Sequence, residues 1–80
     1  MGNWKKILEK VMSGQADSNI RYEDLCHLLL RLGYRSRQSG SHNIFRKENC
    51  DLINLQNSGG KAKAYQVQQV REQLRKQDLP

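Results

Sequence analysis

Residues 34–56 read YRSRQSGSHNIFRKENCDLINLQ, and this stretch decides the fold. Its side chains alternate in character over three short segments, and small or polar turn residues separate those segments. The predicted strands are Tyr34–Gln38, His42–Lys47 and Leu52–Gln56, with turns at 39–41 and 47–50. Strands joined by turns this short pair antiparallel, so the stretch predicts a three-stranded meander.

Helical periodicity flanks this stretch on both sides. Apolar residues recur at helical spacing in three segments, which are Trp4–Met12, Tyr22–Leu32 and Tyr65–Lys76. Gly14 and Gly33 follow the first two, as is usual for a residue just past a helix end. We therefore expect an α+β domain, in which a three-stranded antiparallel sheet carries helices on one face and leaves the other face open to water or a ligand.

Length and composition limit the possible functions. Eighty residues make one domain, and the net charge of +6 favours a polyanionic partner. No apolar run approaches the ~20 residues of a membrane span, and the first residues lack the features of a secretory signal, so we expect no membrane association. Cys26 and Cys50 match no metal-ligand spacing, even with His27 and His42 added. Two reduced thiols are favoured over a disulfide, which points to the cytoplasm.

The positive charge is concentrated in two segments. Residues 31–47 contain five Arg or Lys and no acid, and residues 58–76 contain five against Glu72 alone. The two segments converge if the last helix packs across the sheet, and we favour nucleic acid as their partner over a merely solvated surface. The loop 58–63, Ser-Gly-Gly-Lys-Ala-Lys, leads into the last helix. It is either a phosphate cradle at the helix start or a flexible connector.

His42 is the candidate proton-transfer group, because histidine is the main residue type that titrates near neutral pH. It begins the second predicted strand, inside the first basic segment. The alternation leaves its direction open. If Phe45 faces the core, His42 points away from it together with Ile44, and if Ile44 faces the core, His42 does too. A packing or surface role for His42 stays open on these residues, whereas His27 is interpreted as a boundary residue of its helix.

The chain from Tyr22 to Leu74 resembles the HicA family, the small mRNA-cleaving toxins of HicA–HicB toxin–antitoxin pairs. The resemblance is carried by LLLRLGY at 28–34, GSHNIFR at 40–46, INL at 53–55, and a lysine-containing loop before a final helix. It implies a fold similar to a double-stranded RNA-binding domain, with His42 of the Gly-Ser-His motif as the catalytic residue. It also implies mRNA as substrate and a HicB-type antitoxin as partner.

The chain departs from the family pattern at three places. Asn43 stands where many members have a second histidine, and Ala64 stands where a proline often precedes the last helix. The segment 1–20 is an N-terminal helical extension, ahead of a HicA-like domain at 21–77 and a frayed tail at 78–80. The activity that we expect is metal-independent endoribonuclease cleavage by a monomer without cofactors.

In this hypothesis His42 acts as general base on a ribose 2′-hydroxyl, and nearby cations stabilise the charge of the transition state. For that second role Arg46, Lys61 and Lys63 are candidates. The complete set of candidate RNA-binding residues is Arg35, Arg37, Ser41, Arg46, Lys47, Lys61, Lys63 and Arg71. Two alternatives remain, which are a non-catalytic RNA-binding module of the same fold and an interaction protein that docks through the helix Trp4–Met12.

Overall fold

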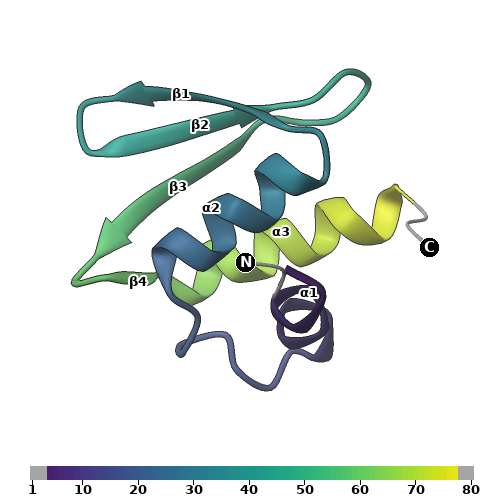
Figure 1. Cartoon of the computed structure of the whole chain (residues 1–80), viewed down its shortest axis with the longest axis vertical. Coiled ribbons are helices and arrows are strands. Elements are labelled where there is room, and N and C mark those ends of the chain that lie inside the picture. The colour runs from purple at the N-terminus through teal and green to yellow at the C-terminus, as the bar shows by residue number, and fades with distance from the viewer. Residues whose placement is uncertain (1–3, 78–80) are drawn as a thin grey trace.

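The computed structural model describes residues 4–77 as three helices and a four-stranded antiparallel sheet (Figure 1). The helices are α1 (Trp4–Ser13), α2 (Tyr22–Arg31) and α3 (Ala64–Lys76). The strands are β1 (Arg35–Ser39), β2 (His42–Arg46), β3 (Ile53–Ser58) and β4 (Lys61–Ala62), and they are neighbours in chain order. The predicted α+β class is confirmed. The predicted tail at 78–80 and the first three residues of the predicted extension lie outside the described residues.

The sheet has one strand more than the sequence predicts, because part of the expected loop 58–63 forms β4. Gly59 and Gly60 make a tight turn with φ of 63° and 90°, and Ser58 pairs with Lys61 across it. A two-residue hairpin turn of this kind needs positive φ at both positions, which glycine adopts freely. The side-chain oxygen of Asn57 accepts the Gly60 N–H at 2.7 Å. A strand of two residues is too short to show an alternating pattern, so the sequence carried no signal for it.

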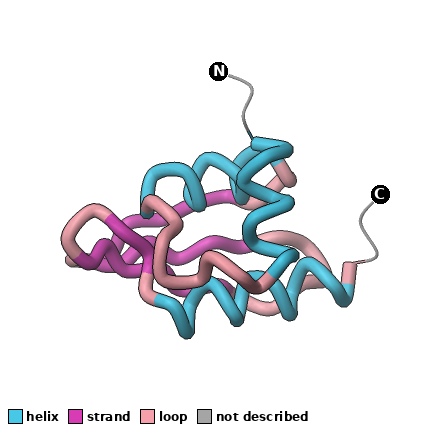
Figure 2. The backbone as a smooth tube through the Cα atoms, turned by 90° about the horizontal axis from the view of Figure 1, so that it is seen from below, coloured by secondary structure: helices cyan, strands magenta, loops and turns pink. Residues whose placement is uncertain are grey.

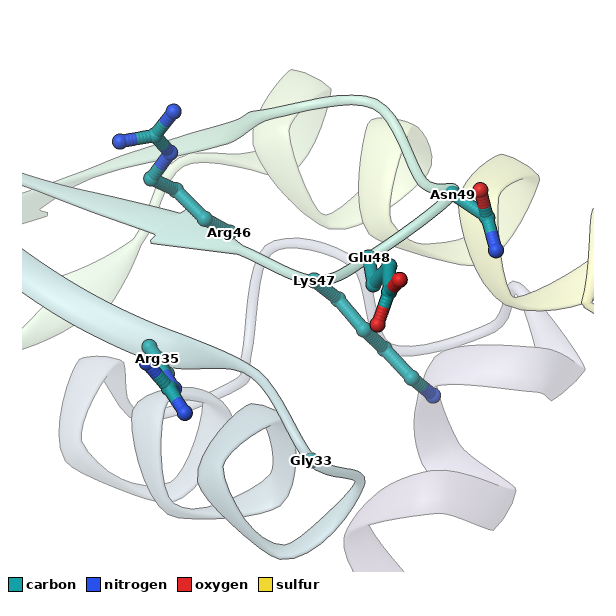
Figure 3. Close-up of a pocket in the computed structure, with 6 residues that line it drawn as sticks. All are labelled: Gly33, Arg35, Arg46, Lys47, Glu48 and Asn49. Carbon is teal, nitrogen blue, oxygen red and sulfur yellow. The ribbon is translucent and has the colours of Figure 1, made fainter.

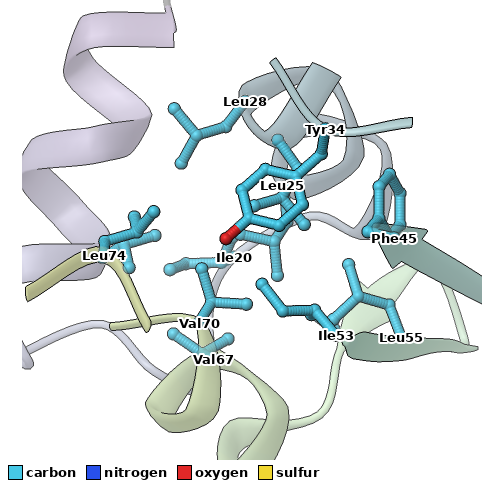
Figure 4. Close-up of a cluster of buried hydrophobic side chains, with 13 residues drawn as sticks. Ile20, Leu25, Leu28, Tyr34, Phe45, Ile53, Leu55, Val67, Val70 and Leu74 are labelled. Carbon is cyan, nitrogen blue, oxygen red and sulfur yellow. The ribbon is translucent and has the colours of Figure 1, made fainter. Parts of the chain in front are cut away.

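The core lies between the sheet and the helices, which cover one face of the sheet (Figures 1 and 2). Each layer supplies fully buried apolar side chains, and the largest are drawn in Figure 4. The sheet supplies Phe45, Ile53 and Leu55, α2 supplies Leu25, Leu28 and Leu29, and α3 supplies Val67, Val70 and Leu74. Burial of each such side chain contributes roughly 1.5–3 kcal/mol. This packing fixes which face of each strand is inside.

Helix α1 packs onto α2 and α3 with its own apolar stripe. Val11 is fully buried, and Trp4, Ile7, Leu8 and Met12 pack partly buried against the core. The guanidinium of Arg31 lies 5.6 Å from the centre of the Trp4 ring, a cation–π distance that ties the end of α2 to the start of α1. The apolar stripe that the interaction-protein alternative would dock on a partner therefore packs inside the chain. Within residues 4–77, no helix has the length and apolar character needed to cross a membrane.

Candidate functional site

The register of the sheet settles the direction of His42. Phe45 is buried, and His42 and Ile44 alternate with it along β2, so both point away from the core. This is the first of the two directions that the sequence left open. His42 thus projects from the face of the sheet that no helix covers, and its side chain is half-buried.

Residues that pair directly across antiparallel strands point to the same face, so the pairing defines the whole uncovered surface. On β1 and β2 the pairs are Arg35 with Arg46, Arg37 with Ile44, and Ser39 with His42. On β2 and β3, Ile44 pairs with Asn54 and His42 with Gln56, and Ser58 pairs with Lys61 on β4. We call this surface the open face. Its members are Arg35, Arg37, Ser39, His42, Ile44, Arg46, Asn54, Gln56, Ser58 and Lys61.

The His42 ring is held by a hydrogen bond from the neighbouring strand. Its Nδ1 lies 3.1 Å from the side-chain carbonyl oxygen of Asn54 on β3. Because a carbonyl oxygen only accepts hydrogen bonds, this contact favours the tautomer in which Nδ1 carries the proton and donates it. The lone pair is then on Nε2, the ring nitrogen that makes no such contact with Asn54. This is the arrangement in which one ring nitrogen is oriented while the other is left to act as a base.

Basic residues of the open face lie at different distances from His42. Arg37 is the diagonal neighbour of His42 across β1 and β2, and such neighbours are about 7–8 Å apart. Arg46 is four residues further along β2, which at about 3.3 Å per residue is roughly 13 Å. Lys61 is two strands away, on β4. Arg37 is therefore the basic side chain best placed to act beside His42, although the sequence nominated Arg46, Lys61 and Lys63 for that role.

Asn43 has a structural contact on the opposite face of β2. Its side-chain N–H donates a hydrogen bond to the hydroxyl of Tyr22, at the start of α2. Burial raises the pKa of Tyr22 above its usual value of 10.0, although the hydrogen bond from Asn43 acts in the other direction. The residue that follows His42 thus ties β2 to α2. Asn43 does not point toward the open face.

The two cysteines are free thiols, as predicted, and both are half-buried. Burial raises the pKa of Cys26 above its usual value, which keeps this thiol protonated and weakly nucleophilic near neutral pH. Cys26 is thus a packing residue of α2. His27 is exposed on the same helix.

Two of the predicted RNA-binding residues are turned away from the open face. Lys47 donates a hydrogen bond from Nζ to Gln77 at 3.0 Å, and its Nζ lies 5.5 Å from the centre of the Tyr34 ring. Arg71 donates to both carboxylate oxygens of Asp17, at 2.8 and 3.2 Å, and to the Val11 carbonyl at 3.1 Å. Because α3 packs against the inner face of the sheet, its basic residues do not converge with the first basic segment. The expectation of convergence is wrong for α3, and only Lys61 on β4 joins the open face.

Two predicted residues lie outside the strands. Ser41 is exposed in the turn directly before His42, and Lys63 is the residue directly before α3, with no capping hydrogen bond from its side chain. Two backbone N–H groups of the loop 58–63 already have partners and are not free for the expected phosphate cradle. The Gly60 N–H bonds Asn57, and the Ala62 N–H donates to the Ile20 carbonyl at 2.9 Å.

Asn54 and Gln56 were not among the predicted site residues, although they alternate with Ile53 and Leu55 along the third predicted strand and therefore lie on its other face. The observed register places Ile44 opposite Asn54 and His42 opposite Gln56. Gln66 on α3 holds the backbone of β3 at Gln56. It is a buried polar residue of α3, and its side-chain oxygen accepts the backbone N–H of Gln56 at 2.9 Å.

Among residues 4–77, no group of three or more His, Cys, Asp or Glu side chains is arranged to hold a metal ion. Comparisons with protein-family models, with curated proteins and with solved structures found no match to this chain.

Proposed function

We propose that this protein is a metal-independent endoribonuclease, the toxin of a HicA–HicB-type pair, and that His42 is its catalytic base. The observation that carries the proposal is the oriented imidazole, held by Asn54 at 3.1 Å on an uncovered and basic sheet face. The element order from α2 through the sheet to α3 adds support, because it agrees with the double stranded RNA-binding-like fold that the family resemblance implies.

In the proposed reaction, Nε2 of His42 takes the proton of a ribose 2′-hydroxyl. The 2′-oxygen then forms a bond to the adjacent phosphorus, and the bond from phosphorus to the 5′-oxygen breaks. The products are a 2′,3′-cyclic phosphate and a 5′-hydroxyl, whose proton comes from water, because the open face carries no second imidazole. General base catalysis by one histidine contributes about 10²–10⁴-fold. The requirement for a 2′-hydroxyl restricts cleavage to RNA.

The open face supplies the electrostatic part of the mechanism. Arg37, the diagonal neighbour of His42, is the first candidate to stabilise the charge that develops on the phosphate. The other cations of the face bind the RNA backbone without reading its sequence. An acidic surface or loop of the antitoxin would cover the same cations and would inhibit the toxin by blocking the access of RNA to the open face.

Induced expression in a bacterial host tests the toxin function. The parent chain should arrest growth and shorten the lifetime of mRNA, and His42→Ala, expressed to the same level, should do neither. Coexpression of the protein encoded beside this chain should restore growth if it is the antitoxin. Growth arrest by both chains alike would refute the role of His42. RNA binding by the purified parent without cleavage would instead identify a non-catalytic RNA-binding module.

A further inference from the structure

Two arginines occupy directly paired positions at the end of the β1–β2 hairpin that is remote from the turn at His42. Arg35 and Arg46 pair directly across the strands, and both side chains are exposed. Like charges directly opposite one another destabilise a sheet. Within residues 4–77, neither forms an ion pair with an acidic side chain. The fold thus keeps two like charges in paired positions without an ion-pair partner for either among residues 4–77.

These arginines line a hollow of about 800 Å³ (Figure 3). The other lining residues are Gly33, Lys47, Glu48 and Asn49. Gly33 lines one side of the hollow with a φ of 100°, and a Cβ there would make an ordinary contact of 3.6 Å with the Cε of Lys47. The Lys47 ammonium is held by Gln77 and Tyr34, so the two guanidinium groups are the cations left for a ligand. Glu48 is the one acid among the lining residues.

The chemistry of the hollow selects the class of ligand. A guanidinium group presents planar N–H donors that match the oxygens of a phosphate. Two guanidinium groups therefore favour a phosphate as the ligand of this hollow. The arginines also lie on the open face with His42, roughly 13 Å away along β2. That separation is too long for both ends to hold one phosphate group, so a ligand that contacts both is a polymer with several phosphates.

We propose that Arg35 and Arg46 form a separate phosphate-binding subsite, which holds the RNA backbone at a nucleotide outside the scissile bond. This inference rests on the proposed function for the identity of the polymer. It adds that the enzyme requires a substrate longer than two nucleosides for full activity. Because Arg46 and His42 both lie on β2, the strand fixes the distance between the subsite and the catalytic base.

The test compares two substrates that differ only in length, a dinucleoside monophosphate and a short single-stranded oligoribonucleotide that contains the same step. The variants are Arg35→Gln and Arg46→Gln, with Arg75→Gln on α3 as the matched control. The subsite predicts that each of the first two lowers kcat/KM for the oligonucleotide about tenfold more than for the dinucleoside, as expected for loss of one charged contact. Arg75→Gln should leave the ratio of kcat/KM for the oligonucleotide to kcat/KM for the dinucleoside as it is in the parent. Glu48→Gln should raise this ratio.

A binding measurement separates this inference from the proposed function. In the His42→Ala background, fluorescence anisotropy with the same oligonucleotide should show about tenfold weaker binding after Arg46→Gln and parental binding after Arg75→Gln. Equal binding by the Arg46→Gln and Arg75→Gln proteins would overturn the subsite, whether or not the parent cleaves RNA. Failure of the parent to cleave RNA, with the binding difference present, would overturn the proposed function and leave the subsite supported.

Discussion

His42 and Asn54 come from neighbouring strands and meet on the uncovered face of the sheet, with the imidazole Nδ1 3.1 Å from the side-chain carbonyl oxygen. The contact orients the ring and favours the tautomer in which Nδ1 carries the proton. It lies beside Arg37 and apart from the Arg35–Arg46 pair. His42 is the proposed base, Asn54 is its positioning residue, and the arginines are the surrounding cations. Each role predicts a different effect of substitution.

Asn54→Ala should lower kcat about tenfold and leave the affinity for RNA unchanged, because it removes a hydrogen bond that orients the base but no phosphate contact. Single-turnover cleavage and equilibrium binding measure the two quantities on the same protein. Gln69→Ala, at an exposed position of α3, is the control. A parallel loss of kcat and RNA affinity in Asn54→Ala would show that Asn54 is a binding residue instead of a positioning residue.

Arg37→Gln should weaken RNA binding and make it less dependent on salt, whereas Arg75→Gln should do neither. Removal of one phosphate contact to a single strand reduces the slope of log K against log salt by about 0.7. Titrations at a series of salt concentrations measure that slope. Identical slopes for parent, Arg37→Gln and Arg75→Gln would contradict the assignment of RNA binding to the open face.

Arg71→Gln should destabilise the fold by about 2 kcal/mol, the scale of a hydrogen bond to a charged group, without weakening RNA binding. Its side chain is 15% exposed, as is that of Asp17, and it also holds the Val11 carbonyl at the end of α1. Arg75→Gln is again the control, because Arg75 and its partner Glu72 are both well exposed. Denaturant unfolding measures the free energies. Loss of RNA binding in a folded Arg71→Gln protein would return Arg71 to the RNA-binding set.

Alkaline conditions should destabilise the fold through Tyr22 and Tyr34. Burial raises the pKa of Tyr22 and of Tyr34 above their usual value of 10.0, so the folded state holds these protons more tightly than the unfolded state does. The stability from this difference is complete below pH 10.0 and is lost as the pH rises through the folded values. Denaturation midpoints on both sides of that pH measure the loss. The double variant Tyr22→Phe, Tyr34→Phe should lose less, and an equally steep fall in both proteins would contradict this account.

Much of the fold is readable from the sequence because its signals are local. Apolar residues at helical spacing predicted all three helices, and turn residues placed β1, β2 and β3 within two residues of their observed bounds. The direction of His42 required one more fact, the burial of Phe45, which depends on packing between distant parts of the chain. The fourth strand was missed because two residues carry no periodicity.

The placement of the candidate residues was predicted in part. His42, Arg35, Arg37, Arg46 and Lys61 do share one face, as the grouping of basic residues suggested. Composition alone does not show which cations already have partners. Lys47 and Arg71 were therefore included among the RNA-binding candidates. In the structure, Gln77 holds Lys47 and Asp17 holds Arg71 away from the open face. Asn54 was missed because it is twelve residues from His42 in the sequence. The pairing of strands brings the two together, and a pattern of charges does not show how strands pair.

Cleavage of a single-stranded RNA by the purified protein, in the presence of a metal chelator, tests the central claim most directly. We expect the parent to produce fragments that end in a 2′,3′-cyclic phosphate and a 5′-hydroxyl. His42→Ala should bind the same RNA with parental affinity and produce at least about 10²-fold less of these fragments. Cleavage at the parental rate by folded His42→Ala protein would contradict the assignment of the catalytic base.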